Sequence, residues 1–492
     1  MNADLLFRGV RVIDGSGEPG FEADVAVCDG RIAAIGDLAG WRAAEVVQGE
    51  GLCLAPGFID VHTHDDTNVI RSPGMLPKLS QGVTTVVVGN CGISAAPVRL
   101  RDNPPDPMNL LGRRHDFVYP SFADYAAAVD EAVPAVNVVA LVGHTALRAN
   151  HMDDLYRAAT PDEIARMRDD LRQALEDGAI GLSSGLAYAS AHAAPTGEVM
   201  ALVEELAAFG GIYTTHLRSE FAEILAAMEE AFAIARHGRV PVVLSHHKCA
   251  GLANWGRTRE TLAFVDRVRR HQRVALDCYP YAGSSSTLDL KQVTDDYDIL
   301  ITWSEPEPGQ AGRTLKQIAD GWGVSLLAAA ARLQPAGAVY HCMDEADVER
   351  VLAHPRTMIG SDGLPNDPLP HPRLWGAFPR VLGRYSRERR LLPLEVAIHK
   401  MTGLSAAEFG LAGRGRLQPG CCADLVLFDP ETIADTADYE RPLQQAVGIE
   451  RVVVNGVTSF RDGRPTGDRA GRMLRRRPLS VAHAALISNP KE

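Results

Sequence analysis

The chain has 492 residues, of which 46% are hydrophobic and 23% charged, and its formal net charge is −12 at pH 7. A chain of this length buries a large core and is expected to form more than one domain. Its negative charge argues against a nucleic-acid partner or an anionic membrane surface. No stretch approaches the roughly 20 apolar residues that a membrane helix needs, so we expect no membrane partner.

The N-terminal residues and the spacing of the cysteines indicate the cellular compartment in which the protein is expected. The first residues lack the basic region and apolar stretch of a signal peptide. The eight cysteines are scattered, apart from the neighbours Cys421 and Cys422, and show no disulfide spacing. Free thiols persist in reducing compartments, so we expect a cytoplasmic protein.

Both ends of the chain have the pattern of short β-strands. Residues 5–13 alternate apolar and polar side chains, and Asp29-Gly30 is typical of a tight hairpin turn. Similar strand-like residues return at 423–428. We therefore predict that residues 1–57 and 411–480 join in one small β-sandwich domain.

The central residues 58–410 alternate short apolar runs with amphipathic helical segments, which is typical of βα units and a parallel sheet. Eight strands close a TIM-like (β/α)8 barrel, so we predict an α/β fold of this class. The gap before the last strand exceeds a simple crossover, and residues 284–345 are predicted to form an insertion or lid. The strand-like runs are residues 57–61, 84–89, 136–142, 179–183, 211–215, 242–245, 274–279 and 357–360.

Residue types that bind zinc stand at or near the ends of these predicted strands. His62 and His64 are two residues apart, so they project to the same face of an extended segment. Alone, a buried histidine or cysteine is usually an ordinary core residue. Together, at strand ends that a barrel gathers on one face, they predict a metal site with room for water. The other candidates are Cys91, His216, His246 and Asp362.

The run that leads to the paired histidines, Ala-Pro-Gly-Phe-Ile-Asp-Val-His-Thr-His at 55–64, resembles the opening motif of the amidohydrolase superfamily. The superfamily's other landmarks follow in order. His216 matches its fifth-strand histidine, His246 its sixth-strand histidine and Asp362 its eighth-strand aspartate. The resemblance covers essentially the whole chain and implies a metal-dependent hydrolase barrel.

One difference from the superfamily's usual metal ligands indicates which family within the superfamily this chain resembles. Many binuclear members bridge their metals with a lysine at the end of the fourth strand, whereas residues 181–188 contain no lysine. The second strand instead ends at Cys91, and a thiolate is a zinc ligand that can replace the missing anionic bridge. This pattern is similar to the N-acyl-D-amino-acid deacylases (D-aminoacylases), as are residues 143–148, 279–281 and 371–376.

The resemblance implies one tightly bound Zn²⁺ on Cys91, His216 and His246. It also implies a second, weaker metal position near His62 and His64, with Cys91 as a candidate shared ligand. Three protein ligands leave zinc a fourth position for water, whose pKa then falls towards ~7.

The resemblance makes Asp362 the expected general base and acid, which takes a proton from water and passes it to the leaving amine. The alternative is an ordinary turn aspartate, because Ser-Asp-Gly is also turn chemistry. The position after the eighth strand favours the catalytic role.

Five residues are expected to contact the substrate. Lys248 lies two residues beyond His246 and faces the barrel mouth if the strand persists. Tyr279 shares a face with Tyr281 by the same spacing, and a guanidinium binds a carboxylate with two donors. For Tyr188 and Tyr281, packing in the wall is an equal alternative. The five candidates are Lys248, Tyr279, Arg373, Tyr188 and Tyr281.

These expectations predict zinc-dependent hydrolysis of N-acyl-D-amino acids to a carboxylate and a free D-amino acid. The D preference comes from the resemblance alone. Residues 279–304 look closer to the N-acyl-D-glutamate branch, yet Asp289 and Lys291 carry opposite charges, so an acidic preference stays open. The enzymatic alternative is a cyclic-amide hydrolase of the dihydroorotase or hydantoinase type, against which the missing lysine argues. The other alternative is a non-catalytic scaffold on the same barrel.

Overall fold

The structure, a computed structural model, describes residues 1–476, and a closed parallel barrel lies at its centre. A three-stranded and a six-stranded sheet supply the barrel strands, and the bridge Thr63–Gly363 joins the first strand to the last. This confirms the predicted TIM-like class, with the fourth strand beginning two residues later than expected. The strands are β6 (Phe58–Asp60), β7 (Val83–Val88), β8 (Asn137–Ala140) continued by β9 (Val142–Gly143), β10 (Gly181–Gly185), β11 (Ile212–His216), β12 (Val242–Leu244), β13 (Val274–Cys278) and β17 (Thr357–Ile359).

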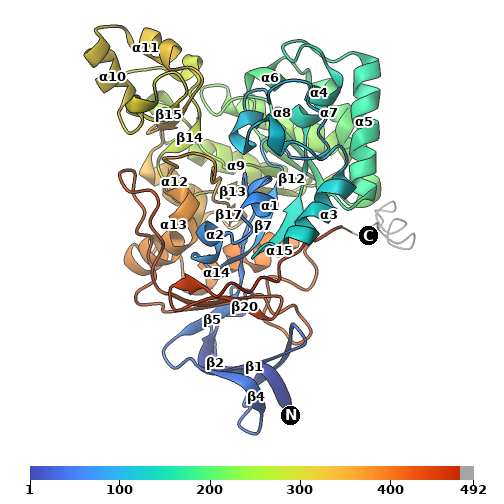
Figure 1. Ribbon diagram of the computed structural model, residues 1–492, viewed down its shortest axis with the longest axis vertical. Coiled ribbons are helices and arrows are strands. Elements are labelled where there is room, and N and C mark those ends of the chain that lie inside the picture. Colours follow the sequence, from blue (N-terminus) through green and yellow to red (C-terminus); the bar gives the residue numbers. More distant parts are fainter. Residues whose placement is uncertain (477–492) are drawn as a thin grey trace.

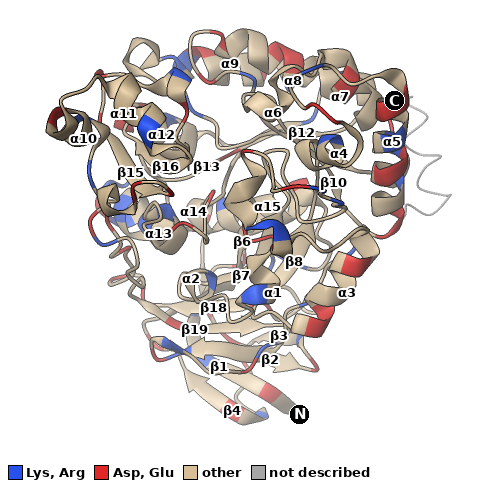
Figure 2. Ribbon diagram, turned by 45° about the horizontal axis from the view of Figure 1, so that its top comes forward, with Lys and Arg blue, Asp and Glu red and all other residues tan. Residues whose placement is uncertain are grey.

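Strand composition and helix amphipathicity explain this architecture. Every residue of β7, Val-Thr-Thr-Val-Val-Val, is buried, as expected for a strand covered on both faces. The outer helices include α5 (Pro161–Glu176), which begins with a capping box between Thr160 and Glu163. Figure 2 shows both signs of charge interspersed along α5. None of the helices among residues 1–476 is long and apolar enough to cross a membrane.

Strands from both chain ends form one nine-stranded sheet, which lies at the foot of the molecule (Figure 1). The two ends meet where β5 (Cys53–Pro56) pairs antiparallel with β18 (Leu425–Phe428). The remaining strands are β1 (Asn2–Val12), β2 (Phe21–Cys28), β3 (Arg31–Gly36), β4 (Arg42–Gln48), β19 (Ile449–Val454), β20 (Val457–Arg461) and β21 (Arg464–Pro465). Residues 477–480 of the predicted domain lie outside the described residues.

The end of the described chain packs on the barrel instead of on this sheet. Leu474 N donates to Val138 O at 2.7 Å, and Val138 N donates to Arg472 O at 2.9 Å. Met473 is 4% exposed within the barrel's hydrophobic core. This segment therefore belongs to the barrel although it follows the small sheet in the chain.

Between β13 and β17 the chain forms an antiparallel sheet of β14 (Ser284–Thr287), β16 (Ala336–Tyr340) and β15 (Ile299–Ser304). Helices α10 (Leu315–Trp322) and α11 (Leu326–Leu333) pack on it around a separate apolar core. Figure 1 shows both helices projecting beside the barrel, at its upper end. The insertion follows the carboxyl end of β13 and lies to one side at that end of the barrel.

Candidate metal centre

Two overlapping groups of metal-binding side chains meet at the carboxyl ends of the barrel strands. The donor atoms of His62, His64, Cys91 and Asp362 all lie within 4.8 Å of one another, and so do those of Cys91, His216 and His246. Cys91 belongs to both groups. Its Sγ lies 3.2 Å from His62 Nε2 and 3.4 Å from His246 Nε2.

These residues fit zinc. Ligands bonded to zinc at 2.3 Å (sulfur) and about 2.0–2.1 Å (nitrogen) stand about 3.5 Å apart in a tetrahedron, close to the two distances from Cys91 Sγ. The Nδ1 atoms of His64 and His216 are buried and have no hydrogen-bond partner among residues 1–476. Buried polar atoms are normally paired, so these nitrogens are available to a metal.

The surroundings of Cys91 favour the thiolate form of its side chain. Burial alone raises its pKa, but the neighbouring His62 and His246 hold the pKa well below its ordinary value. The thiolate is the form that binds metal. Cys91 therefore offers a negative charge between the two groups, where the sequence lacks a bridging lysine.

Two carboxylates that the sequence analysis missed orient the histidines. Asp277, in β13, has Oδ1 at 3.1 Å from His62 Nδ1 and accepts the backbone N–H of His246 at 2.8 Å. Glu220 has Oε1 at 3.0 Å from His246 Nδ1. Carboxylates on the far nitrogen of a ligating histidine fix its orientation and tautomer. The available signals were Asp277 inside an apolar strand and Glu220 four residues after His216.

Asp362 lies between a histidine and an arginine. Its Oδ1 is 3.1 Å from His64 Nε2, and its Oδ2 is 2.8 Å from Arg373 Nη1. Burial raises the pKa of Asp362, but Arg373 and then His62 more than offset this and hold the pKa well below its ordinary value. The side chain is therefore an ionised carboxylate, as a proton acceptor must be.

The backbone at three of these residues is strained. Cys91, His246 and Asp362 have φ of 55°, 37° and 50°, the left-handed region that non-glycine residues rarely adopt. Such strain persists only where the surroundings hold it. The hydrogen bond from Asp362 N to His62 O, at 2.8 Å, is one such restraint.

Four of the five predicted substrate contacts lie around these groups. The Tyr188 ring lies 4.8 Å from the His216 ring, centre to centre. Arg373, the first residue of α13 (Arg373–Arg380), stacks its guanidinium 4.5 Å from the Tyr279 ring centre. Lys248 Nζ lies 5.9 Å from the same ring centre. Arginine, lysine and two tyrosines thus surround one side of the metal donors.

Lys248 is engaged differently from the prediction. Its Nζ donates to Glu220 Oε1 at 2.6 Å, lies 3.0 Å from His246 Nδ1 and donates to His246 O at 3.2 Å. The ammonium thus bonds to Glu220 and to the backbone of His246, whose Nδ1 faces the same carboxylate. Lys248 is therefore also part of the support of His246.

The rings of Tyr281 and Tyr279 both lie near His371, but their hydroxyl groups have different partners. Strand β13 ends at Cys278, so the alternation of side chains stops before Tyr279. The Tyr281 hydroxyl lies 3.4 Å from Asp435 Oδ2, and its ring stacks 4.5 Å from the Arg380 guanidinium. Tyr281 belongs to the packing behind the site.

Outside both metal groups, a buried carboxylate ties two helices together. Glu198, in α7 (Thr196–Val203), bonds to Arg148 and to His144 Nε2, 2.9 Å away, both in α4 (His144–His151). Burial raises the pKa of Glu198, but His144 and Arg148 lower it to about 2. The ionised carboxylate is thus favoured in the folded state.

This pKa predicts a pH-dependent stability. A depressed carboxyl pKa stabilises the fold above the ordinary value of about 4.3, and the contribution is lost as pH falls towards about 2. We expect Glu198→Gln to lower the free energy of unfolding by about 3 kcal/mol at pH 7 and by much less at pH 3. Urea unfolding at both pH values measures this. The exposed Glu229→Gln is the control, and an equal loss at both pH values contradicts the assignment.

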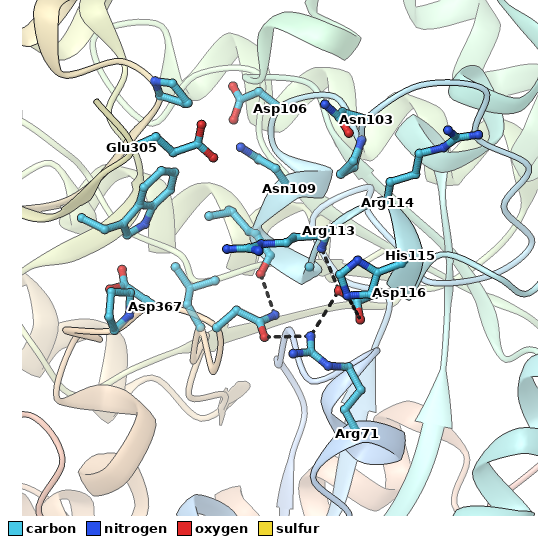
Figure 3. A pocket seen from close by; sticks show the side chains of 18 residues that line it. Arg71, Asn103, Asp106, Asn109, Arg113, Arg114, His115, Asp116, Glu305 and Asp367 are labelled. Carbon is cyan, nitrogen blue, oxygen red and sulfur yellow. Dashed lines mark hydrogen bonds and ion pairs between the residues drawn. The ribbon is translucent and has the colours of Figure 1, made fainter. Parts of the chain in front are cut away.

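A cavity of about 880 Å³ opens beside the loop that follows Asp362 (Figure 3). In Figure 3, Asp106 and Glu305 lie at one side of it, and Arg114 and His115 lie at another. Its described lining contains none of the predicted metal ligands, but Leu364 is only two residues beyond Asp362. The cavity is therefore distinct from the two groups of metal donors.

The chain is similar to known proteins over nearly its whole length. The model of the amidohydrolase family matches residues 45–460. D-aminoacylase of Alcaligenes xylosoxydans xylosoxydans is 52% identical, over 96% of this chain and 98% of that protein. N-acyl-D-glutamate deacylase of the same organism is 48% identical, over 99% of each. The crystal structure of N-acyl-D-glutamate deacylase from Bordetella bronchiseptica, complexed with zinc and a phosphonate inhibitor, has a TM-score of 0.94 at 48% identity, covering 96% of this chain and 100% of that one.

Proposed function

Because the chain belongs to the amidohydrolase family, we propose that it hydrolyses the amide bond of N-acyl-D-amino acids with the help of bound zinc. The observation that carries this proposal is Cys91, whose sulfur lies in both groups of metal donors with the carboxylate of Asp362 beside them. The identity to D-aminoacylase and to N-acyl-D-glutamate deacylase supports the substrate class.

Cys91, His216 and His246 would hold zinc, which when bound would polarise the substrate carbonyl and activate a water molecule. Asp362 takes the proton of the attacking water and returns it to the leaving amine nitrogen. Arg373 keeps Asp362 ionised before that transfer. His62 and His64 would hold a second, weaker metal, for which Cys91 is a candidate shared ligand.

The α-carboxylate of the substrate needs donors that the protein leaves free. Arg373 Nε and Nη1 are buried without a hydrogen-bond partner among the described residues, although Nη1 is ion-paired with Asp362. The Tyr279 hydroxyl has only a 3.8 Å contact to Met343 Sδ. We assign the carboxylate to Arg373 and Tyr279, with the charge of Lys248 near Tyr279 and with Tyr188 beside His216.

Lys248→Met is expected to raise KM about tenfold and to change kcat less, because the ammonium attracts the substrate carboxylate in ground and transition states alike. Steady-state kinetics with an N-acetyl-D-amino acid measures both constants. Lys316→Met, an exposed lysine paired with Asp320, serves as the control. An unaltered KM removes Lys248 from substrate binding.

The test of the function is a substrate panel on protein of known metal content. We expect hydrolysis of N-acetyl-D-amino acids, no comparable rate on the L enantiomers, and loss of activity on chelation. Activity on dihydropyrimidines instead favours the cyclic-amide alternative. Full activity in metal-free protein excludes zinc-dependent hydrolysis.

An acidic side-chain preference stays a prediction. The two cations that contact the metal donors are already paired, Lys248 with Glu220 and Arg373 with Asp362. A second substrate carboxylate therefore needs another cation. Rates on N-acetyl-D-glutamate, D-aspartate, D-methionine and D-leucine decide this, and comparable rates on D-methionine exclude the acidic preference.

We also propose a cytoplasmic location. All eight cysteines are free in the structure, which suits a reducing compartment.

A further inference from the structure

A buried lysine lies under the catalytic face, although no step of the proposed reaction uses it. Lys78 belongs to the short helix α2 (Leu76–Leu79) and is 0% exposed. Its Nζ lies 2.8 Å from Asp60 Oδ2, 2.8 Å from Ser361 Oγ and 3.2 Å from Asp65 Oδ2. The ammonium therefore donates two hydrogen bonds, to Asp60 and Ser361, and is ion-paired with Asp65. Burying a charge is costly unless such partners compensate it.

These acceptors flank the residues of the site. Asp60 stands two residues before His62, and Ser361 directly precedes Asp362. Asp60 Oδ1 accepts the backbone N–H of Ser361 at 2.8 Å and that of His62 at 3.3 Å. The lysine thus joins the end of β6 to the end of β17 through side chains.

Few backbone contacts join the first barrel strand, β6, to the last, β17. The contact between the first and last barrel strands is the isolated bridge Thr63–Gly363, beside regular ladders elsewhere in the described barrel. The ion-pair partner of Lys78, Asp65, directly follows His64. The ammonium therefore reaches both sides of the junction where the carboxylate of Asp362 meets the imidazole of His64.

We propose that Lys78 is a positioning residue that holds Asp362 against the first-strand histidines by tying the end of β6 to the end of β17. This inference rests on the proposed function. Because the partners of Lys78 include neither Cys91 nor His216 nor His246, its loss is expected to leave the tight zinc in place. The expected defect is in proton transfer.

The experiment compares Lys78→Met with Lys400→Met. Lys400 is also a buried lysine attached to β17, but it donates to Thr357 O, at 3.1 Å, at the other end of that strand. We expect Lys78→Met to lower kcat at least tenfold, with KM within twofold and zinc per chain unchanged. Lys400→Met is expected to lower the melting temperature while kcat of the folded protein stays near wild type.

A second readout needs no activity. Hydrogen–deuterium exchange of a peptide covering 360–364 reports the hydrogen bonds of Ser361 and Asp362, and we expect at least tenfold faster exchange in Lys78→Met only. Normal exchange and normal kcat in this variant overturn the proposal. If Lys78→Met does not fold, Ser361→Ala takes its place, with a smaller loss of kcat expected and an unchanged kcat overturning the proposal. A wild-type protein inactive on D-substrates refutes the function instead, while the exchange result still tests the positioning.

Discussion

Asp362→Asn is expected to lower kcat about a thousandfold while leaving zinc content and folding unchanged. General acid–base catalysis contributes typically 10²–10⁴-fold, and an amide of the same shape neither accepts nor returns the proton. The amide oxygen still reaches Arg373, 2.8 Å from Oδ2 in the native protein, so the local structure persists. Steady-state kinetics on an N-acetyl-D-amino acid and elemental analysis check the two parts.

The matched control is Asp170→Asn. Asp170 is likewise ion-paired, with Arg99 at 2.8 Å and His151 at 2.8 Å, but it lies on the outer helix α5. We expect its kcat to remain within twofold of wild type. A folded, zinc-loaded Asp362→Asn variant with near-normal kcat moves the proton transfer to another group.

Cys91→Ala has the second large effect, a loss of metal. The sulfur lies 3.2 Å from His62 Nε2 and 3.4 Å from His246 Nε2, so its removal deletes the one ligand common to both donor groups. We expect bound zinc to fall below about a tenth of an ion per chain after dialysis, and kcat to fall with it. Two imidazoles alone hold zinc far more weakly than a site completed by a thiolate.

Cys278→Ala is the control for this loss. Cys278 is also buried at the end of a barrel strand, but burial raises the pKa of its thiol, the opposite direction from Cys91. Its variant is expected to retain full zinc. Full zinc occupancy in Cys91→Ala excludes the sulfur from the ligand set.

The alternation of short apolar runs with amphipathic helical segments made it possible to predict the barrel from the sequence. Strand β7 is a short run of buried, β-branched residues, and the zinc-binding residue types stand at or after the ends of such short buried strands. His62 and His64, two apart in extended chain, were predictable as neighbours for the same reason. The insertion between β13 and β17 was visible as a gap too long for a crossover.

Sequence spacing gives less information about side-chain partners after a strand ends, because the two-residue alternation of side chains stops there. Tyr281 was placed beside Tyr279 by alternation, but β13 ends at Cys278 and the chain turns at Pro280, which sends Tyr281 to Asp435. Lys248 follows the end of β12 in the same way and meets Glu220. Spacing predicts a shared face only while the strand continues.

The sequence by itself determined the barrel, the zinc-binding donor types and their order along the chain, because hydrophobic period and residue chemistry are local properties. Only the tertiary structure decided which carboxylates support which histidines, how Arg373 meets Asp362, and that Lys78 joins the first strand to the last. Some of these partners are far apart in the sequence; Lys78 and Ser361, for example, are separated by 283 positions. Contacts at such separations are selected by the packing of whole elements, which no local pattern encodes.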